Sequence, residues 1–184
     1  MLAKGPGGMK RTTIPIIHVY ASPLDRARGV VVAGALRLPC ALGRSGIAIV
    51  KREGDGRTPR GRFRLLSLTY RADHGPRPRS SLPARVTRRN DGWCDAPGDR
   101  RYNCPVVLPY PASAETMWRD DHLYDAVVDI AWNRGPRIAG RGSAIFLHVA
   151  RSGFKPTEGC VAVDAKAIRR LLAVIGPHTI LAIH

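Results

Sequence analysis

The chain has 184 residues, of which 44% are hydrophobic and 24% are charged. This length and balance are typical of one globular domain with its own core, and they exclude a chain that is disordered throughout. The charge is strongly positive, because 30 Lys and Arg residues stand against 14 Asp and Glu residues, giving a formal net charge of +16.

The first half of the domain is expected to consist of short strands. β-branched and alternating apolar residues favour strands over residues 14–20, 29–34, 36–42, 47–51 and 61–65. Pro39 predicts an edge position for its strand, since proline has no N–H for a neighbour on that side. In the last of these segments, arginines alternate with apolar residues, which is typical of a strand with one buried face.

The middle of the chain changes in composition. Over residues 71–103, apolar residues become rare and Arg, Pro, Asp and Gly dominate, which predicts a long irregular insertion anchored by Trp93 and Tyr102. We then expect a brief strand at 106–108 and one or two helical turns at 115–121.

The last part of the domain is expected to hold strands at 125–131, 143–149 and 179–183, and one clear helix. Asp164 is a good N-cap for that helix. Its buried face repeats at helical spacing, with apolar residues at Ile168, Leu171, Leu172 and Ile175. Gly176 and Pro177 predict its end. Together these patterns predict a mainly β fold, with a flexible tail over residues 1–12 and one domain over 13–184.

The cysteines indicate no structural metal. Cys40, Cys94, Cys104 and Cys160 form no C-x-x-C pair and have no histidine at zinc-finger spacing.

The start of the chain shows no secretion signal and no apolar run of membrane-spanning length. We therefore expect a cytoplasmic protein with free thiols, and a periplasmic one if the start site is misassigned.

One pair of residues is suited to nucleophilic catalysis. His148 ends a hydrophobic strand, and Cys160 follows twelve residues later, after a turn-prone loop. An imidazole beside a thiol can take its proton, and the resulting ion pair is expected to lower the pKa of the thiol. Gly159 would allow close approach of a substrate carbonyl to backbone N–H groups. The alternative is that both side chains simply belong to the core, where free cysteines are common.

Three segments resemble one known family, the YkuD-type L,D-transpeptidases. The first is the run over residues 143–163, with a strand that ends in His and a later Gly-Cys. The second is the Gly-Asp…Thr-Pro-x-Gly-x-Phe pattern within residues 51–63, and the third combines residues 91–95 with Tyr102 and Asn103. Two features depart from the family: Glu158 stands where most members have His, and the interval from His148 to Cys160 is short.

The resemblance implies a YkuD-like fold, a β-sandwich of mixed sheets with a long irregular insertion. It also implies acyl transfer on peptidoglycan stem tetrapeptides, with no cofactor. Cys160 would be the nucleophile and His148 the general base and acid, with the backbone carbonyl of Val149 orienting the imidazole. Backbone N–H groups at Glu158, Gly159 and Cys160 would hold the oxyanion.

The resemblance leaves the acceptor and the substrate contacts open. An amine would complete a transpeptidation and water a carboxypeptidase reaction, on a polymer or a soluble muropeptide. Glu158, Trp93, Tyr102 and Arg151 are the candidates for contact with the substrate.

The positive charge supports an alternative from another class, a basic nucleic-acid-binding module. Against it, 25 of the 30 basic residues are Arg and only 5 are Lys, and aromatic residues make up only 6% of the chain. No helix-turn-helix or RNP-like run is present either. The sequence therefore favours the enzyme, with no metal and no membrane insertion.

Overall fold

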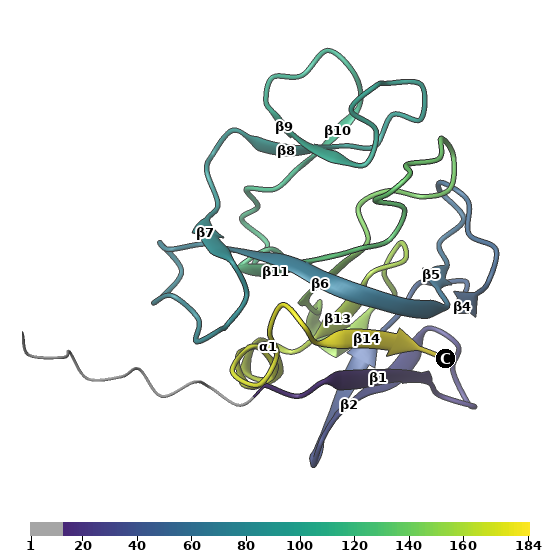
Figure 1. Cartoon of the computed structure of the whole chain (residues 1–184), viewed down its shortest axis with the longest axis vertical. Helices are drawn as coiled ribbons and strands as arrows, with labels where there is room; N and C mark the ends of the chain where they lie inside the picture. Colours follow the sequence, from purple (N-terminus) through teal and green to yellow (C-terminus); the bar gives the residue numbers. More distant parts are fainter. Residues whose placement is uncertain (1–12) are drawn as a thin grey trace, which may run out of the picture.

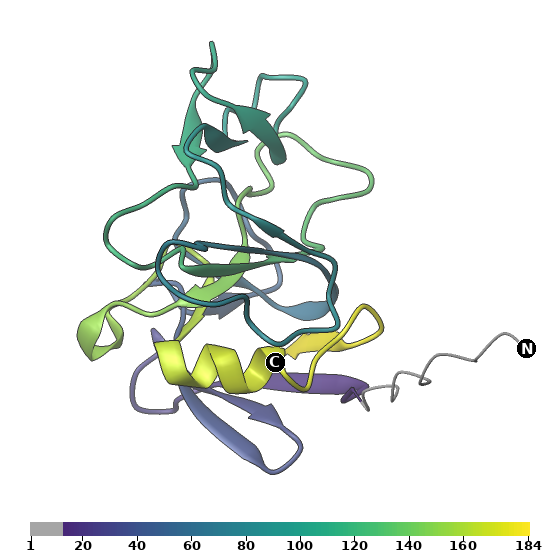
Figure 2. The same ribbon diagram turned by 90° about the vertical axis from the view of Figure 1, so that its left-hand side faces the viewer.

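The computed structural model describes residues 13–184; the predicted flexible tail, residues 1–12, lies outside the described residues. Within them, the chain is mainly β, with one α-helix, α1 (Ala165–Leu172), near the C-terminus (Figures 1 and 2). The predicted mainly β fold with one C-terminal helix is confirmed. None of the described helices is long and apolar enough to cross a membrane.

Within the described residues, eight strands close into a mixed barrel. Their order is β11 (Ala126–Ile130), β12 (Phe146–Val149), β13 (Val161–Val163), β3 (Leu36–Ala41), β2 (Arg28–Ala33), β1 (Ile16–Ala21), β14 (Ile180–Ile183) and β6 (Gly61–Tyr70). β6 also pairs with β11, which joins the two ends of this series. The mixed sheets expected from the sequence are therefore one continuous, closed sheet. A ninth strand, β7 (Ala84–Val86), lies parallel to β6 outside the closed ring.

Alternating residues of these strands fill the barrel. Ile17 and Val19 of β1 and Leu147 of β12 are fully buried in one core cluster. The helix adds its apolar face to the same cluster through Ile168 and Leu171, as its spacing predicts. Burial of each such aliphatic side chain stabilises the folded state by about 1.5–3 kcal/mol. The alternation of apolar residues therefore determines which face of each strand points inward.

The insertion between β6 and β11 carries a small sheet of its own. β8 (Asp91–Cys94) lies between β9 (Cys104–Val107) and β10 (Ala114–Thr116), at the top of Figure 1. The expected irregular insertion is therefore partly regular. The helical turns predicted at 115–121 are wrong, because residues 114–116 pair with β8 instead.

Two further details differ from the sequence prediction. The strand expected at 47–51 is reduced to β4 (Ile47–Ala48), which pairs with the equally short β5 (Thr58–Pro59).

Pro39 lies in β3, a strand with a neighbour on each side, but β13 pairs only with Cys40 and Ala41 of β3. Pro39 is therefore paired on one side only, to Val30 of β2, and its missing N–H disrupts no ladder.

The helix α1 begins where the sequence predicts but ends earlier than predicted. Asp164 accepts hydrogen bonds from the N–H groups of Lys166 and Ala167, both at 2.9 Å, as an N-cap does. The helix ends at Leu172 with Ala173 as its C-cap, so the predicted end at Gly176 is wrong. Gly176 belongs to a separate turn, in which its N–H donates to the hydroxyl of Thr179 at 2.9 Å.

We expect Asp164→Ala to lower the free energy of unfolding by about 1 kcal/mol, because two N–H groups at the helix start lose their acceptor. Urea unfolding of the purified protein measures this. Lys166→Ala, at an exposed helix position, is the matched control and should change little. Equal stability of Asp164→Ala and the parent protein would contradict the prediction.

Candidate functional site

The parallel pairing of β12 with β13 places the two candidate catalytic residues on one face of the barrel wall. Leu147 lies opposite Val161, and His148 lies opposite Ala162. Cys160 is two residues before Ala162, so its side chain points to the same side as that of His148. Leu147 and Val161 point into the barrel, and the two candidates therefore lie on its outer face.

The thiol of Cys160 lies in a second apolar cluster, between the barrel wall and the insertion. The cluster includes Trp93, Tyr124 and Phe146. The Sγ atom of Cys160 accepts a hydrogen bond from the N–H of Phe146 at 3.3 Å and donates to the carbonyl of Ala144 at 3.2 Å. Backbone groups of one neighbouring segment thus hold the sulfur in place.

His148 is buried, and its backbone neighbour fixes its tautomer. Nδ1 lies 2.8 Å from the carbonyl oxygen of Val149. A carbonyl can only accept, so the proton of the neutral ring is on Nδ1 and the lone pair is on Nε2. The ring also packs edge-on against Tyr124, with 5.3 Å between the centroids. The hydrogen bond expected from the family resemblance is therefore present.

Burial keeps both groups neutral. It raises the pKa of the Cys160 thiol to about 12 and lowers the pKa of His148 to about 4, although the carbonyls of Val149 and Leu123 favour the charged ring. The sequence led us to expect an ion pair that lowers the pKa of the thiol, but burial raises this pKa instead. Burial thus favours the neutral form of both the imidazole and the thiol.

Both groups open onto a cleft of about 480 Å³. Two of the candidate substrate contacts, Glu158 and Arg151, also line it. Glu158 is exposed at 75% of its side chain and forms an ion pair with Arg44. Other residues of the lining lie in the segments that resemble the family but were not singled out there: Lys51, Glu53, Asp95, Ser143 and Lys155. The sequence analysis missed Glu115, Arg119 and Tyr124 altogether.

Trp93 and Tyr102 are buried and are absent from the lining of the cleft. Trp93 packs edge-on against Phe146, with 4.9 Å between centroids. The hydroxyl of Tyr102 donates to Glu53, whose carboxylate also accepts from the hydroxyl of Ser143 at 2.8 Å. Both aromatic residues thus anchor the insertion, as the sequence predicts, and Tyr102 positions a residue of the cleft.

A buried asparagine joins the insertion to the barrel side of the site. The Oδ1 atom of Asn103 accepts from the Trp93 indole at 3.0 Å and from the N–H of Ala144 at 3.1 Å. Its Nδ2 atom donates to the carbonyls of Trp132 and Asn133 at 3.0 and 2.9 Å. All four hydrogen bonds of the amide are therefore used, and they hold the segment that supports the sulfur.

One wall of the cleft combines a tyrosine, a glutamate and an arginine. The hydroxyl of Tyr124 donates to Glu115 at 2.6 Å, and the guanidinium of Arg119 lies 5.2 Å from the centre of the Tyr124 ring. Burial raises the pKa of Glu115, although Tyr124 and Arg119 oppose this. These residues come from the insertion, where no sequence pattern marked them.

Gly159 lies where several segments meet. Its φ is +136°, a conformation that favours glycine, and a Cβ atom there would lie 2.7 Å from the carbonyl oxygen of Arg57. Its N–H donates to the hydroxyl of Thr157 at 3.2 Å. Crowding as well as backbone conformation therefore requires glycine before Cys160.

Among the described residues, one group has the composition and spacing to hold a metal ion: His74, His122 and Asp125. It includes neither Cys160 nor His148. The cleft itself is lined by the thiol of Cys160 and the imidazole of His148, a pair of groups suited to nucleophilic catalysis.

Comparison with known proteins gives one match. Residues 26–183 match the family described as YkuD, L,D-transpeptidase catalytic domain. No curated protein and no solved structure matches the chain.

We expect the rate of Cys160 alkylation by iodoacetamide to rise about tenfold per pH unit between about pH 7 and pH 9, without a plateau. The thiolate is the reacting form, and burial raises the pKa of the thiol to about 12. Peptide mapping by mass spectrometry follows this cysteine separately from the others. A plateau below pH 9 would show that the thiol ionises more easily than its burial implies.

We expect Gly159→Ala to destabilise the protein by at least about 2 kcal/mol, because the new Cβ atom combines backbone strain with a clash. Gly153→Ala is a matched control in the same loop: its φ is +72°, but nothing lies within 4 Å of an added Cβ atom. Thermal unfolding of the two variants measures the difference. Equal melting temperatures would remove the case for crowding at Gly159.

Proposed function

Because the chain belongs to the YkuD family of L,D-transpeptidase catalytic domains, we propose that Cys160 and His148 carry out its acyl transfer on peptidoglycan stem peptides. The observation that carries the proposal is their placement. The thiol and the imidazole lie on one face of adjacent parallel strands and open onto the same cleft. The Val149 carbonyl holds the proton on Nδ1, which leaves Nε2 free to act as a base.

The proposed reaction begins with attack of the Cys160 sulfur on the carbonyl between the L-centre of diaminopimelate and the terminal D-Ala. His148 takes the thiol proton on Nε2 as the carbon–sulfur bond forms. It then gives that proton to the nitrogen of the departing D-Ala, and a thioester remains. Because burial disfavours the charged forms of both groups, we propose that proton transfer accompanies the attack instead of preceding it.

The negative oxygen of the intermediate needs donors, and we assign them to the backbone around Gly159. In the free protein the N–H of Gly159 donates to the hydroxyl of Thr157 at 3.2 Å, which is a long hydrogen bond. A charged oxygen is a stronger acceptor than a hydroxyl, so it would take over this donor. Thr157 remains fixed through its other hydrogen bond, to the carbonyl of Cys160 at 2.7 Å.

The second half of the reaction resolves the thioester with either an amine or water. The cleft lining carries the cations Lys51, Arg119, Arg151 and Lys155 as well as the anions Glu53, Asp95, Glu115 and Glu158. Cations suit the carboxylates of a stem peptide, and an acidic group at the cleft suits an incoming ammonium. Exposed Glu158 is therefore the residue that we propose to contact an amine acceptor, at the position where most family members have His.

An assay on a disaccharide-tetrapeptide tests the proposal, with products identified by mass. Loss of D-Ala alone reports hydrolysis, and a joined product in the presence of a second, amine-bearing muropeptide reports transpeptidation. Release of D-Ala in neither condition would contradict the proposed activity.

We expect Cys160→Ala to abolish turnover and His148→Gln to lower the rate by about 10²–10⁴, the usual effect of losing an acid–base group. Cys40→Ala is the matched control. Cys40 is equally a buried thiol, on the neighbouring strand β3, but it faces the barrel core. Circular dichroism checks that each variant is folded. Turnover at the parent rate in folded Cys160→Ala would overturn the mechanism.

A further inference from the structure

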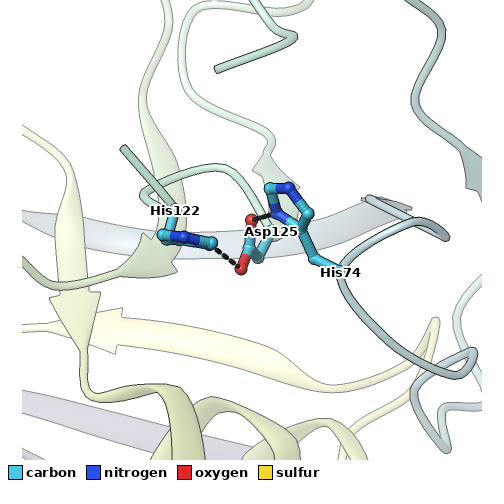
Figure 3. A group of neighbouring side chains, drawn as sticks. All are labelled: His74, His122 and Asp125. Atoms are coloured by element: carbon cyan, nitrogen blue, oxygen red, sulfur yellow. Dashed lines mark hydrogen bonds and ion pairs between the residues drawn. The ribbon is translucent and has the colours of Figure 1, made fainter. Parts of the chain in front are cut away.

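The closure of the barrel brings two distant histidines together. β6 and β11 pair so that Tyr70 lies opposite Ala126. The chain that leaves β6 reaches His74, and the chain that enters β11 passes through His122 and Asp125. Figure 3 shows the result, in which the Asp125 carboxylate lies between the two imidazole rings.

The three side chains point toward one another at short range. Nδ1 of His74 lies 2.5 Å from one carboxylate oxygen of Asp125, and Nδ1 of His122 lies 3.0 Å from the other. The ring centroids of the two histidines are 4.6 Å apart. One ligand atom from each residue fits within a mutual separation of 4.8 Å. A single small cation bound to all three side chains could replace these two hydrogen bonds.

We propose that His74, His122 and Asp125 form a binding site for Zn²⁺. Two imidazole nitrogens with one carboxylate favour a borderline transition ion over Mg²⁺ or Ca²⁺, which require more oxygen ligands. Three protein ligands leave a fourth position for water. Zn–N and Zn–O bonds of about 2.0–2.2 Å place tetrahedral ligand atoms about 3.4 Å apart. His122 is exposed at 66% of its side chain and can move by the small distance this needs.

The surroundings of His74 provide a second carboxylate. Nε2 of His74 lies 3.0 Å from the guanidinium of Arg71, which is held in turn by two hydrogen bonds to Asp73. A zinc ion on Nδ1 displaces the proton of that atom to Nε2. An Asp73 oxygen lies 3.6 Å from Nε2, and a small turn of the imidazole away from the Arg71 guanidinium would let this oxygen accept the proton. A carboxylate behind a ligating histidine is the usual support of zinc sites.

The proposed ion would steady a wall of the catalytic cleft. His122 and Asp125 flank Leu123 and Tyr124, which both line the cleft. The carbonyl of Leu123 accepts from the N–H of Val149 at 3.1 Å, and Tyr124 packs on His148. Zinc would tie the turn that carries these two residues to the segment that follows β6. The ion has a structural role in this proposal and takes no part in the acyl transfer.

Titration of the purified chain with Zn²⁺ and Co²⁺ tests the site. The protein is prepared without a polyhistidine tag, stripped with chelator, and carries Cys160→Ala so that the catalytic thiol cannot bind metal. We expect one equivalent of Zn²⁺ by calorimetry, a saturable rise in melting temperature, and Co²⁺ absorption without the intense near-ultraviolet band of thiolate ligands. Mg²⁺ and Ca²⁺ should not compete.

His122→Asn is the decisive variant. Its backbone has φ +63°, which asparagine tolerates, so the turn should remain folded. We expect Zn²⁺ affinity to fall about tenfold or more and the rise in melting temperature to disappear. His18→Asn is the matched control, because His18 and His184 form the other close imidazole pair, 2.9 Å apart.

Three results would overturn the proposal. They are no binding by the parent protein, parent-like binding by His122→Asn, and loss of binding in His18→Asn instead. None of these readouts depends on the acyl-transfer reaction.

Discussion

The parallel pairing of β12 with β13 is the constraint on which the site depends. Side chains alternate along each strand, so a slip of one residue would turn His148 into the barrel and bring Leu147 out. Leu147, Val161 and Val163 have no exposed surface, and moving them into water would cost several kcal/mol. The barrel core therefore sets the register, and the relative position of the base and the thiol follows from it.

The features that the sequence predicted well are those with a local signal. Alternating apolar residues marked the strands, and Asp164 marked the start of the helix. Its end was misplaced because Gly176 is used in the next turn, where Thr179 binds its N–H. The closure of the barrel had no local signal, since β6 and β11 meet across the whole insertion. The strand at 114–116 was missed for the same reason, because it exists only through its pairing with β8.

The site was predictable to a similar extent. The family resemblance pointed to Cys160, His148 and the Val149 carbonyl together as candidates, because they lie within one short segment. Glu115, Arg119 and Tyr124 come from the insertion and carry no motif that relates them to a cleft. The sequence led us to expect a lowered pKa for the thiol, whereas burial raises this pKa. Trp93, Tyr124 and Phe146 surround Cys160 only after the insertion has packed on the barrel.

The four hydrogen bonds of Asn103 bear on the chemical ageing of the protein. Deamidation to aspartate would replace the Nδ2 donor with a carboxylate oxygen facing the carbonyls of Trp132 and Asn133, at the distances now used by hydrogen bonds. Two acceptors would then repel each other, with a negative charge in a residue that is 2% exposed. In the folded protein, the four hydrogen bonds of the amide restrict the movement toward the next backbone N–H that deamidation requires. A chain that deamidates here before it folds would lack the connection between the insertion and the barrel.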